Sequence, residues 1–351
     1  MWNDNDYMKA LSARQGRREK RPTLRDVAHR AGVSIVTASR ALNAHPLVAQ
    51  STRARIVAAQ AELGYVPNLL ARGLVQNRTA TVGVLIPELA NPFFAPMVSG
   101  IEAIAAKHRF LTIVGESRRQ EAEEQLYVEQ FRQFRVGGII ASPVTTRLDH
   151  LLAARAAGIP VIVMAWPWPG GDYVATDDVQ GGRLAARHIL SRQHRRIGLV
   201  RMADPRHAPI QARVQGFREV LAAAGVEIQN GWDVQVAGAQ IEDGIAAADR
   251  LLALPARPSA LFVTSDRVAI GLIFQLQMRG VRVPEDVALV SHDDIPYAMT
   301  AQVPLTTVAV PKRSLGEKAA NLLFQRSEGK GSAKPRQILL SPELVVRASC
   351  P

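Results

Sequence analysis

Residues 23–43 read TLRDVAHRAGVSIVTASRALN, and this stretch decides how the N-terminal part of the chain folds. The Thr23 hydroxyl can accept a hydrogen bond from the amide of Asp26, whose carboxylate reaches back. This arrangement is a capping box and predicts a helix. That helix is expected to stop at Gly32, and Ser34 can cap a second helix directly after it. Only a tight turn then separates the two helices, as in a helix-turn-helix.

Two further helices are expected in the N-terminal part. An amphipathic helix from about 52 to 63 completes a helix-turn-helix domain at 21–66. Pro67 then opens a helix of one or two turns within a hinge and linker segment at 67–79. Gly73 and the short length make this hinge helix marginal by itself, so it should fold only when something packs against it.

The positive charge of the chain is concentrated near its N-terminus. The formal net charge is +12, and residues 1–79 contain thirteen Lys or Arg residues against five acidic residues. This segment therefore carries +8, and residues 1–20 within it are expected to form a flexible basic arm. The asymmetry favours a polyanionic partner, because each neutralised phosphate releases counterions. The alternative is a solvated basic tail without a partner.

From residue 81 onward, short apolar runs alternate with helical stretches. The runs are typical of buried parallel strands and fall at 81–87, 111–115, 138–141, 160–164, 197–200, 234–237, 260–264 and 287–290. Two consecutive sets of four strand and helix units predict two doubly wound α/β lobes. We expect lobe 1 at about 80–176 plus 305–335 and lobe 2 at about 177–304 plus 336–351, with a ligand cleft between them.

Several protein classes are excluded by what the sequence lacks. No apolar run reaches about 18 residues, no secretory signal opens the chain, and Cys350 is the single cysteine, so a cytoplasmic protein is expected. No nucleotide-binding or hydrolase motif occurs, and the eight histidines have no metal-ligand spacing. We therefore expect no catalytic residue, no metal and no cofactor. The missing signal and the N-terminal domain also argue against a periplasmic solute-binding protein.

Several segments together resemble the lactose repressor and galactose repressor (LacI/GalR) family of bacterial transcription regulators. The matching segments are 23–28, 31–43, 64–68, 82–87, 91–94, 177–178, 181–182 and Pro311, so the resemblance covers nearly the whole chain. It implies a helix-turn-helix headpiece followed by a two-lobed core similar to type I periplasmic binding proteins. It also implies a sequence-specific regulator, expected to be a repressor, that is controlled by a small effector.

The resemblance places three residues that contact DNA bases on the second helix. Ile35, Val36 and Arg40 match the family positions that select the operator. The Arg40 guanidinium can bridge O6 and N7 of guanine, whereas Ile35 and Val36 offer apolar contact to a thymine methyl group. The alternative is that Ile35 and Val36 belong to the headpiece core. Thr37, Ser39 and Asn43 suit phosphate contacts, and the remaining DNA-binding candidates are Thr23, Ser34, Asn68 and Ala71.

Leu74 is the predicted minor-groove contact. In the family a leucine at this place in the hinge helix wedges into the minor groove at the centre of a palindromic site, which bends the duplex. Packing of Leu74 on its dimer mate is compatible with that role, and both need two copies of the chain. We therefore expect a homodimer on a pseudopalindromic operator. No leucine heptads follow Pro311, so a tetramer held by a C-terminal coiled coil is not expected.

By the same resemblance, Arg213 and Asp293 match the family's effector-binding arginine and aspartate. An arginine and a carboxylate can divide vicinal hydroxyls between donor and acceptor, so a carbohydrate-like effector is expected. The alternative for this pair is a structural salt bridge between the lobes. Asn91, Phe93 and Phe94 are expected to line the cleft from lobe 1, with buried core as the alternative for the two phenylalanines.

Other residues bear on the chemistry of the effector. Asp266 opens a helix and either binds the effector or only caps that helix. Arg206 and His207 precede Arg213 closely, and their positive charge prompts the hypothesis of an anionic effector, a sugar acid or a sugar phosphate. The tryptophans of 166–168 either stack on a sugar face or belong to a surface loop. A nucleobase or nucleoside is the alternative effector, and induction and corepression both remain open.

The chain departs from the family pattern at two places. The family usually has Ser where this chain has Ala49, so a cap or phosphate contact is lost unless Ser51 supplies it. The family usually has glycine and an aromatic residue before the pair of aspartates, where this chain has Ser291 and His292.

Overall fold

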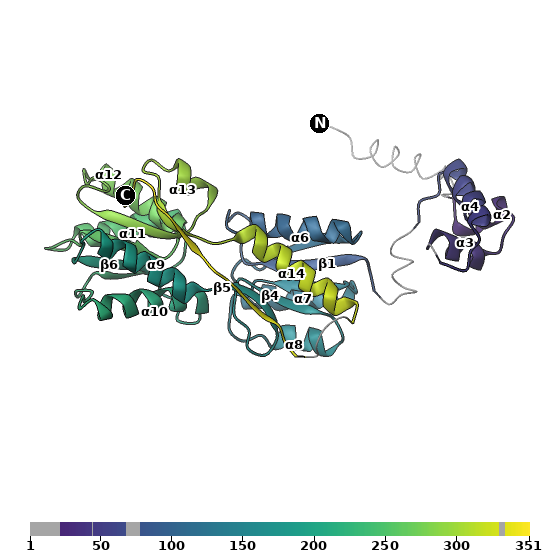
Figure 1. The fold of residues 1–351 in the computed structure, drawn as a ribbon, viewed down its shortest axis with the longest axis horizontal. Helices are drawn as coiled ribbons and strands as arrows, with labels where there is room; N and C mark the ends of the chain where they lie inside the picture. Colours follow the sequence, from purple (N-terminus) through teal and green to yellow (C-terminus); the bar gives the residue numbers. More distant parts are fainter. Residues whose placement is uncertain (1–21, 44, 68–77, 330–333) are drawn as a thin grey trace, which may run out of the picture. The chain divides into compact units, whose positions relative to one another are not determined.

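The computed structural model describes residues 22–43, 45–67, 78–329 and 334–351, which fall into two compact units (Figure 1). The first unit ends at Asn77, and the second runs from Arg78 to Pro351. Within the described residues, no helix is long and apolar enough to cross a membrane. The hinge candidates Asn68, Ala71 and Leu74 lie outside the described residues.

The first unit is built from the helices α2 (Leu24–Arg30), α3 (Ile35–Leu42) and α4 (Gln50–Leu63). The predicted capping box is present, because the Asp26 carboxylate accepts from the Thr23 amide at 2.8 Å and the Thr23 hydroxyl accepts from the Asp26 amide. The three helices share one core, which consists of Val27, Ala28, Ala31, Ala38, Ala41, Ile56 and Ala59. The helix-turn-helix predicted from the sequence is confirmed.

The α4 helix begins at Gln50, two residues earlier than the sequence predicts. The apolar pattern could not show this, because the helix opens with the polar pair Gln50 and Ser51. Ala49 is the N-cap and the helix has no side-chain capping bond, so Ser51 does not replace the lost cap, and a phosphate contact of Ser51 stays a prediction. At its other end Gly64 closes the helix in the left-handed conformation, with φ of 60°.

Truncation of Ile56 should loosen the headpiece. Its side chain is fully buried among all three helices, so Ile56→Ala leaves a cavity that costs about 2–5 kcal/mol. Hydrogen–deuterium exchange of residues 24–63 should become faster in this variant. Val57→Ala is the matched control, because Val57 is half exposed on the same helix. Equal exchange in the two variants would show that Ile56 does not anchor the core.

Lobe 1 of the second unit has a six-stranded sheet in the order β11-β5-β4-β3-β1-β2. Its strands are β1 (Thr81–Ile86), β2 (Leu111–Glu116), β3 (Gly138–Ala141), β4 (Val161–Met164), β5 (Asp172–Thr176) and β11 (Gln337–Leu340). On one face pack α6 (Ala95–Lys107) and α14 (Lys312–Ser327), and on the other α7 (Glu121–Gln133) and α8 (Asp149–Ala156). All strand pairs of this sheet are parallel.

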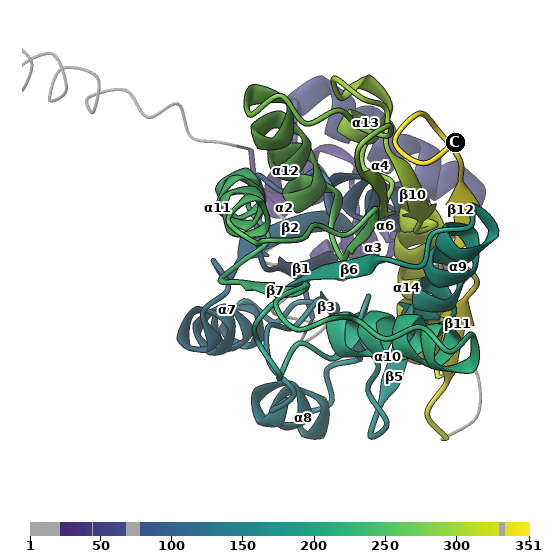
Figure 2. The ribbon, with the colours of Figure 1, turned by 90° about the vertical axis from the view of Figure 1, so that its left-hand side faces the viewer.

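Lobe 2 has a second six-stranded sheet in the order β12-β10-β9-β8-β6-β7. Its strands are β6 (Ile197–Met202), β7 (Asp233–Val236), β8 (Ala260–Val263), β9 (Ala288–Asp293), β10 (Thr306–Ala309) and β12 (Glu343–Val345). Figure 2 shows α9 (Asp178–Ser191) and α10 (Ala208–Ala223) on one side of this sheet and α11 (Ile241–Leu252) and α12 (Asp266–Met278) on the other. The short helix α13 (Pro296–Thr300) follows β9.

The chain passes between the lobes three times, and two of these crossovers differ from the expected lobe boundaries. β10 pairs with β9 and therefore belongs to lobe 2, although residues 305–335 were expected in lobe 1. β11 pairs with β5 and therefore belongs to lobe 1, although 336–351 were expected in lobe 2. β11 is an edge strand and β10 lies next to one, and both contain polar residues, so no apolar run shows which sheet each one joins. The crossovers lie at 177, 310–311 and 341–342.

Three pairs of helices in the core cross on glycines. A Cβ atom added to Gly182 would lie 1.9 Å from the carbonyl oxygen of Arg213, so α9 and α10 are in backbone contact there. Gly216 is equally close to the backbone of α9, and the pairs α11 with α12 and α6 with α14 repeat the arrangement. A side chain at such a crossing would force the helices apart, since the interior is already close-packed.

Candidate functional site

The α3 helix presents an apolar pair outward. Ile35 is 41% exposed and Val36 is 59% exposed, whereas Ala38 and Ala41 on the opposite face are buried. Ile35 and Val36 are therefore not part of the headpiece core, which was the alternative. Contact of the two side chains with bases stays a prediction, and their exposure at the N-terminal turn of a helix-turn-helix fits it.

The polar groups around α3 divide into two sets. Ser34 caps the helix by accepting from the Thr37 amide at 3.1 Å, and the two hydroxyls lie 2.8 Å apart. Thr23 uses its hydroxyl in the capping box of α2. Arg40 and Asn43 are exposed, and Arg40 forms no ion pair with any described residue. Arg40 is therefore the side chain of this helix that is free to bind an anion or a guanine.

The core site lies at the carboxyl ends of the lobe 2 strands. Asp293 ends β9, Thr264 directly follows β8, and Asp178 begins α9 just after a crossover. Ligands of doubly wound sheets bind at this edge, because loops from neighbouring parallel strands converge there. The topology of lobe 2 thus brings together residues that are more than a hundred positions apart in the sequence.

Arg213 of α10 is the centre of this site and is only 6% exposed. Its Nε donates to Asp178 at 2.8 Å, and its Nη1 donates to the Thr264 carbonyl at 2.8 Å and to Asp293 at 3.2 Å. Nη2 has no partner among the described residues and keeps two N–H groups available. All of these groups belong to lobe 2, so Arg213 and Asp293 do not form a salt bridge between the lobes.

Opposite charges face one another at this site. The Arg213 guanidinium lies between the buried carboxylates of Asp178 and Asp293, and the buried Lys312 ammonium, which donates to the Asp293 carbonyl, adds a second positive charge. Burial by itself raises the pKa of Asp293, but the charge of Arg213, the contact with His292 and the charge of Lys312 together outweigh burial and lower it. Burial likewise works to lower the pKa of Arg213, while the two carboxylates raise it. Both ions of the pair are therefore kept charged at neutral pH.

Asp266 is enclosed rather than open to a ligand. Its carboxylate accepts from the hydroxyl of Thr307 at 2.7 Å, from the hydroxyl of Ser291 and from the amide of Ile295 at 2.8 Å. It makes no capping bond to α12, so the expectation that it only caps this helix is wrong. Burial raises its pKa to about 7, with the charge of Asp293 as the second cause. Asp266 ties β9 to β10, and its complete burial disfavours the predicted effector contact.

The aromatic candidates of lobe 1 separate into core and surface. Phe94 belongs to the core cluster under α6, which was the alternative for this residue. Phe93 is half-buried and meets the Phe94 ring edge-on, with centroids 5.2 Å apart. Asn91 is buried, and its side-chain oxygen accepts from the Phe93 amide at 3.0 Å. Phe93 is thus the ring of this segment that is left partly open.

Arg206 and His207 suggested an anionic effector, but neither supplies the unpaired positive charge that this hypothesis needs. Arg206 is already paired with Asp204 at 3.0 Å on the surface. His207 caps α10, packs on Trp166 with centroids 4.9 Å apart, and is uncharged, because burial and then the charge of Arg213 lower its pKa to about 3. Trp166 and Trp168 are both buried, so neither belongs to an exposed surface loop.

The sequence reading assigned no role to two residues that complete the site. Asp178 forms the shorter of the two ion pairs of Arg213. The sequence could have indicated it, because the aspartate pair 177–178 is among the segments that match the family. His292 is fully buried, its Nδ1 lies 3.3 Å from Asp293, and its Nε2 has no hydrogen-bond partner among the residues that the structure describes. Burial, followed by the charge of Arg213, lowers the pKa of His292, so the ring adds no charge to the site.

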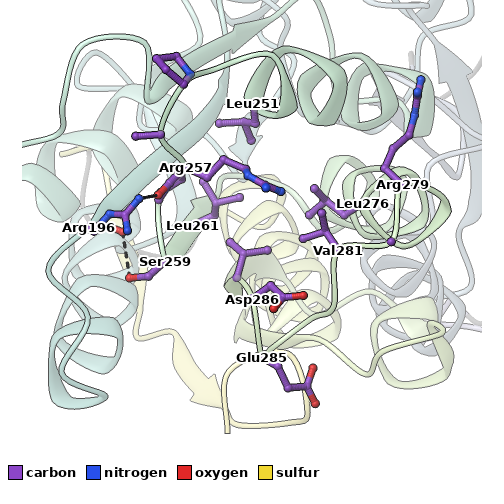
Figure 3. A pocket seen from close by; sticks show the side chains of 15 residues that line it. Arg196, Leu251, Arg257, Ser259, Leu261, Leu276, Arg279, Val281, Glu285 and Asp286 are labelled. Carbon is purple, nitrogen blue, oxygen red and sulfur yellow. Dashed lines mark hydrogen bonds between the residues drawn. The ribbon is translucent and has the colours of Figure 1, made fainter.

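A separate pocket of about 770 Å³ opens at the opposite edge of the lobe 2 sheet (Figure 3). Arg196, Ser259 and Val287 precede their strands there, so this pocket lies at the amino ends of the strands, away from Arg213. Two of its charged residues form ion pairs: Arg279 with Asp249, and Asp286 with Arg282. None of the candidate effector residues lines it.

The headpiece matches the family model "Bacterial regulatory proteins, lacI family" over residues 23–68, and the core matches a periplasmic binding protein-like domain over 186–350. The repressor PurR of Photobacterium profundum is 32% identical over 330 residues, which are 93% of this chain and 98% of that protein. The chain belongs to the lacI family. It is accordingly a DNA-binding transcription repressor and not an enzyme.

Two further similarities bear on this lacI-family chain. The ribose operon repressor of Escherichia coli is 31% identical over 330 residues, covering 93% of this chain and 99% of that protein. The solved structure of the lac repressor dimer bound to operator and the anti-inducer ONPF superposes with a TM-score of 0.84 at 26% identity, covering 94% of this chain and 99% of that one. The expected headpiece and two-lobed core are confirmed.

Removal of the Arg213 charge should destabilise this repressor strongly. Arg213→Met removes the ion partner that Asp178 and Asp293 share in the interior, which costs about 3–5 kcal/mol of unfolding free energy. The loss should shrink as the pH falls, because the unpaired carboxylates of the variant then bind protons. Urea unfolding across pH 5 to 8 measures both effects. The control is Arg218→Met on the same helix, whose partly exposed pair with Asp233 should matter little.

Proposed function

We propose that this repressor binds a pseudopalindromic operator as a homodimer and is controlled by a small, neutral, carbohydrate-like effector held between the lobes of its core. The observation that carries the proposal is the buried Arg213, which has two unused N–H groups and is flanked by the carboxylates of Asp178 and Asp293. A cytoplasmic location remains a prediction from the sequence.

The DNA contacts of the proposal rest on the exposed side of α3. Ile35 and Val36 would contact thymine methyl groups, and Arg40 would read guanine in the major groove. Thr37, Ser39 and Asn43 would hold the helix on the phosphates. Asn68, Ala71 and Leu74 of the hinge keep the roles implied by the family resemblance, with Leu74 in the minor groove.

Loss of an apolar base contact, such as that of Val36, should relax sequence preference without abolishing DNA binding. A selection of bound sites from random DNA first defines the operator, and fluorescence anisotropy then compares variants. Val36→Ala should reduce discrimination at a thymine position, and Arg40→Ala should reduce discrimination at a guanine position by about 1–3 kcal/mol. Val57→Ala serves as the control on α4. Removal of residues 1–79 should abolish DNA binding, and DNA binding that survives would contradict the headpiece assignment.

The dimer is supported by apolar side chains on exposed parts of the core. Leu111 is 62% exposed on the edge strand β2, and Met278 is 68% exposed at the end of α12 near Phe274. Large exposed apolar side chains on an edge strand and a helix are typical of a surface that a second copy covers. The similar lac repressor structure is a dimer on its operator, and two headpieces suit a two-fold symmetric site.

The effector class follows from the charge balance at Arg213. A sugar hydroxyl can accept from the free Nη2 and donate to an aspartate, so a neutral polyol satisfies both partners. A sugar acid or sugar phosphate would bring a further anion to a site where Asp178 and Asp293 already match the charges of Arg213 and Lys312, so no unpaired cation favours it. Phe93, the partly open ring of lobe 1, supplies an apolar face for a sugar. The anionic classes are therefore dropped, and a nucleobase remains the alternative.

Calorimetry with matched pairs of ligands tests the effector class. The panel contains neutral sugars, among them D-ribose, together with the carboxylic acid derived from each sugar. We expect binding of at least one neutral sugar and affinity at least about tenfold lower for its acid, since tenfold corresponds to 1.4 kcal/mol. An acid that binds as tightly as its parent sugar would contradict the proposal. Binding of a nucleobase alone would favour the alternative.

A further inference from the structure

Glu88 joins the two lobes of the core. It lies two residues after β1 of lobe 1, and its Oε1 accepts from Nε2 of Gln240 at 3.0 Å and from Nη1 of Arg267 at 2.9 Å. Gln240 and Arg267 both belong to lobe 2. Arg119 of lobe 1 lies 3.5 Å from the other carboxylate oxygen of Glu88. This carboxylate therefore carries an ion pair and a hydrogen bond across the junction.

The position of Glu88, away from the crossovers, lets this contact resist rotation of the two lobes. The three crossovers leave from β5, β10 and β11, which lie at or next to one edge of each sheet. Glu88 follows β1, next to the opposite edge of the lobe 1 sheet, and Gln240 follows β7, the opposite edge strand of lobe 2. If the lobes rotate about the crossovers, groups at the far edge separate most. A bond at that edge resists the rotation better than one near the crossovers.

The contact is built to persist at neutral pH. The side chains of Glu88 and Arg267 are only 16% and 14% exposed, so solvent and salt screen them less than a surface pair. Burial by itself raises the pKa of Glu88, but the hydrogen bonds from Gln240 and Arg267, together with the charges of Arg267 and Arg119, lower it overall. The Glu88 carboxylate is therefore ionised at any pH above the ordinary pKa of glutamate. The ion pair with Arg267 is lost only in acid.

A second contact between the lobes has different chemistry. Trp166 of lobe 1 packs on His207 of lobe 2, and the partly buried Ala208 packs against the same lobe 1 cluster. Because His207 is uncharged at neutral pH, this contact does not depend on charge. Substitutions at Glu88 leave it intact, so the effect of the charged contact can be measured separately.

We propose that Glu88 is a latch that holds the two lobes closed at the edge away from the crossovers. The latch sets how tightly the core retains an effector without touching that effector, because opening must break the bonds to Arg267 and Gln240. Glu88 is thus a positioning residue for effector affinity. This consequence rests on the proposed effector site, whereas the closure itself does not and can be measured without ligand or DNA.

Spin labels on the two lobes test the latch in the full-length protein. Ala122 of α7 and Ala246 of α11 are exposed alanines in different lobes, and both are replaced by cysteine for labelling. The native Cys350 is buried, so it is shielded from the label. Double electron–electron resonance compares Glu88→Gln and Arg267→Gln with the unaltered latch. The matched control is Glu219→Gln, which removes an ion pair with Arg183 inside lobe 2.

The expected result is a population at longer interlobe distances in Glu88→Gln and Arg267→Gln and an unchanged distribution in Glu219→Gln. Circular dichroism confirms that each variant is folded, and both latch substitutions are near in size to the native side chains. Unchanged distances in either latch variant would overturn the proposal, as would an equal shift in the control. Failure of every sugar to bind would affect the proposed effector class but not this measurement.

Discussion

The Arg213 guanidinium holds together three segments of lobe 2 that are far apart in the sequence. It bonds the start of α9 through Asp178, the end of β8 through the Thr264 carbonyl and the end of β9 through Asp293. An arginine buried to this extent is tolerable only with such partners, since an unpaired ion in the interior is very costly. The geometry of the carboxyl edge of this sheet therefore depends on one side chain.

The same interaction shapes the chemistry of the ligand. Because Asp178, Asp293 and the Thr264 carbonyl occupy Nε and Nη1 of the guanidinium, few donors remain, and with Lys312 beside Asp293 the local charges balance. The neutral rings of His207 and His292 lie nearby and add no positive charge. Burial is the common cause, since it keeps imidazoles uncharged but cannot neutralise arginine.

Much of the headpiece could be predicted from the sequence because its signals are local. The capping box at Thr23, the cap at Ser34 and the turn between them each depend on residues within four positions of one another. The start of α4 was less certain, because Gln50 and Ser51 carry no apolar signal. In the core, buried apolar strands such as β1 and β8 were predicted for the same reason.

The remaining features depend on contacts that a sequence pattern does not contain. β10 and β11 join different sheets through their pairing with β9 and β5, which no apolar pattern in the sequence indicates. Arg206 was expected to add charge to the site, but a surface carboxylate two residues away binds it. Asp266 was expected to face a ligand or cap a helix, but hydroxyls from β9 and β10 enclose it. In each case a partner outside the motif decides the role.

The glycine crossings determine where the core can deform. Gly182 with Gly216, Gly244 with Gly271 and Gly100 with Gly316 place helix backbones in direct contact, which leaves no flexible side chains between them to absorb sliding. Each lobe should then move as a rigid body, and bending is confined to the three connecting segments between the lobes. A displacement at the Arg213 edge would rotate the whole lobe and would not be absorbed by rearrangement of side chains within it.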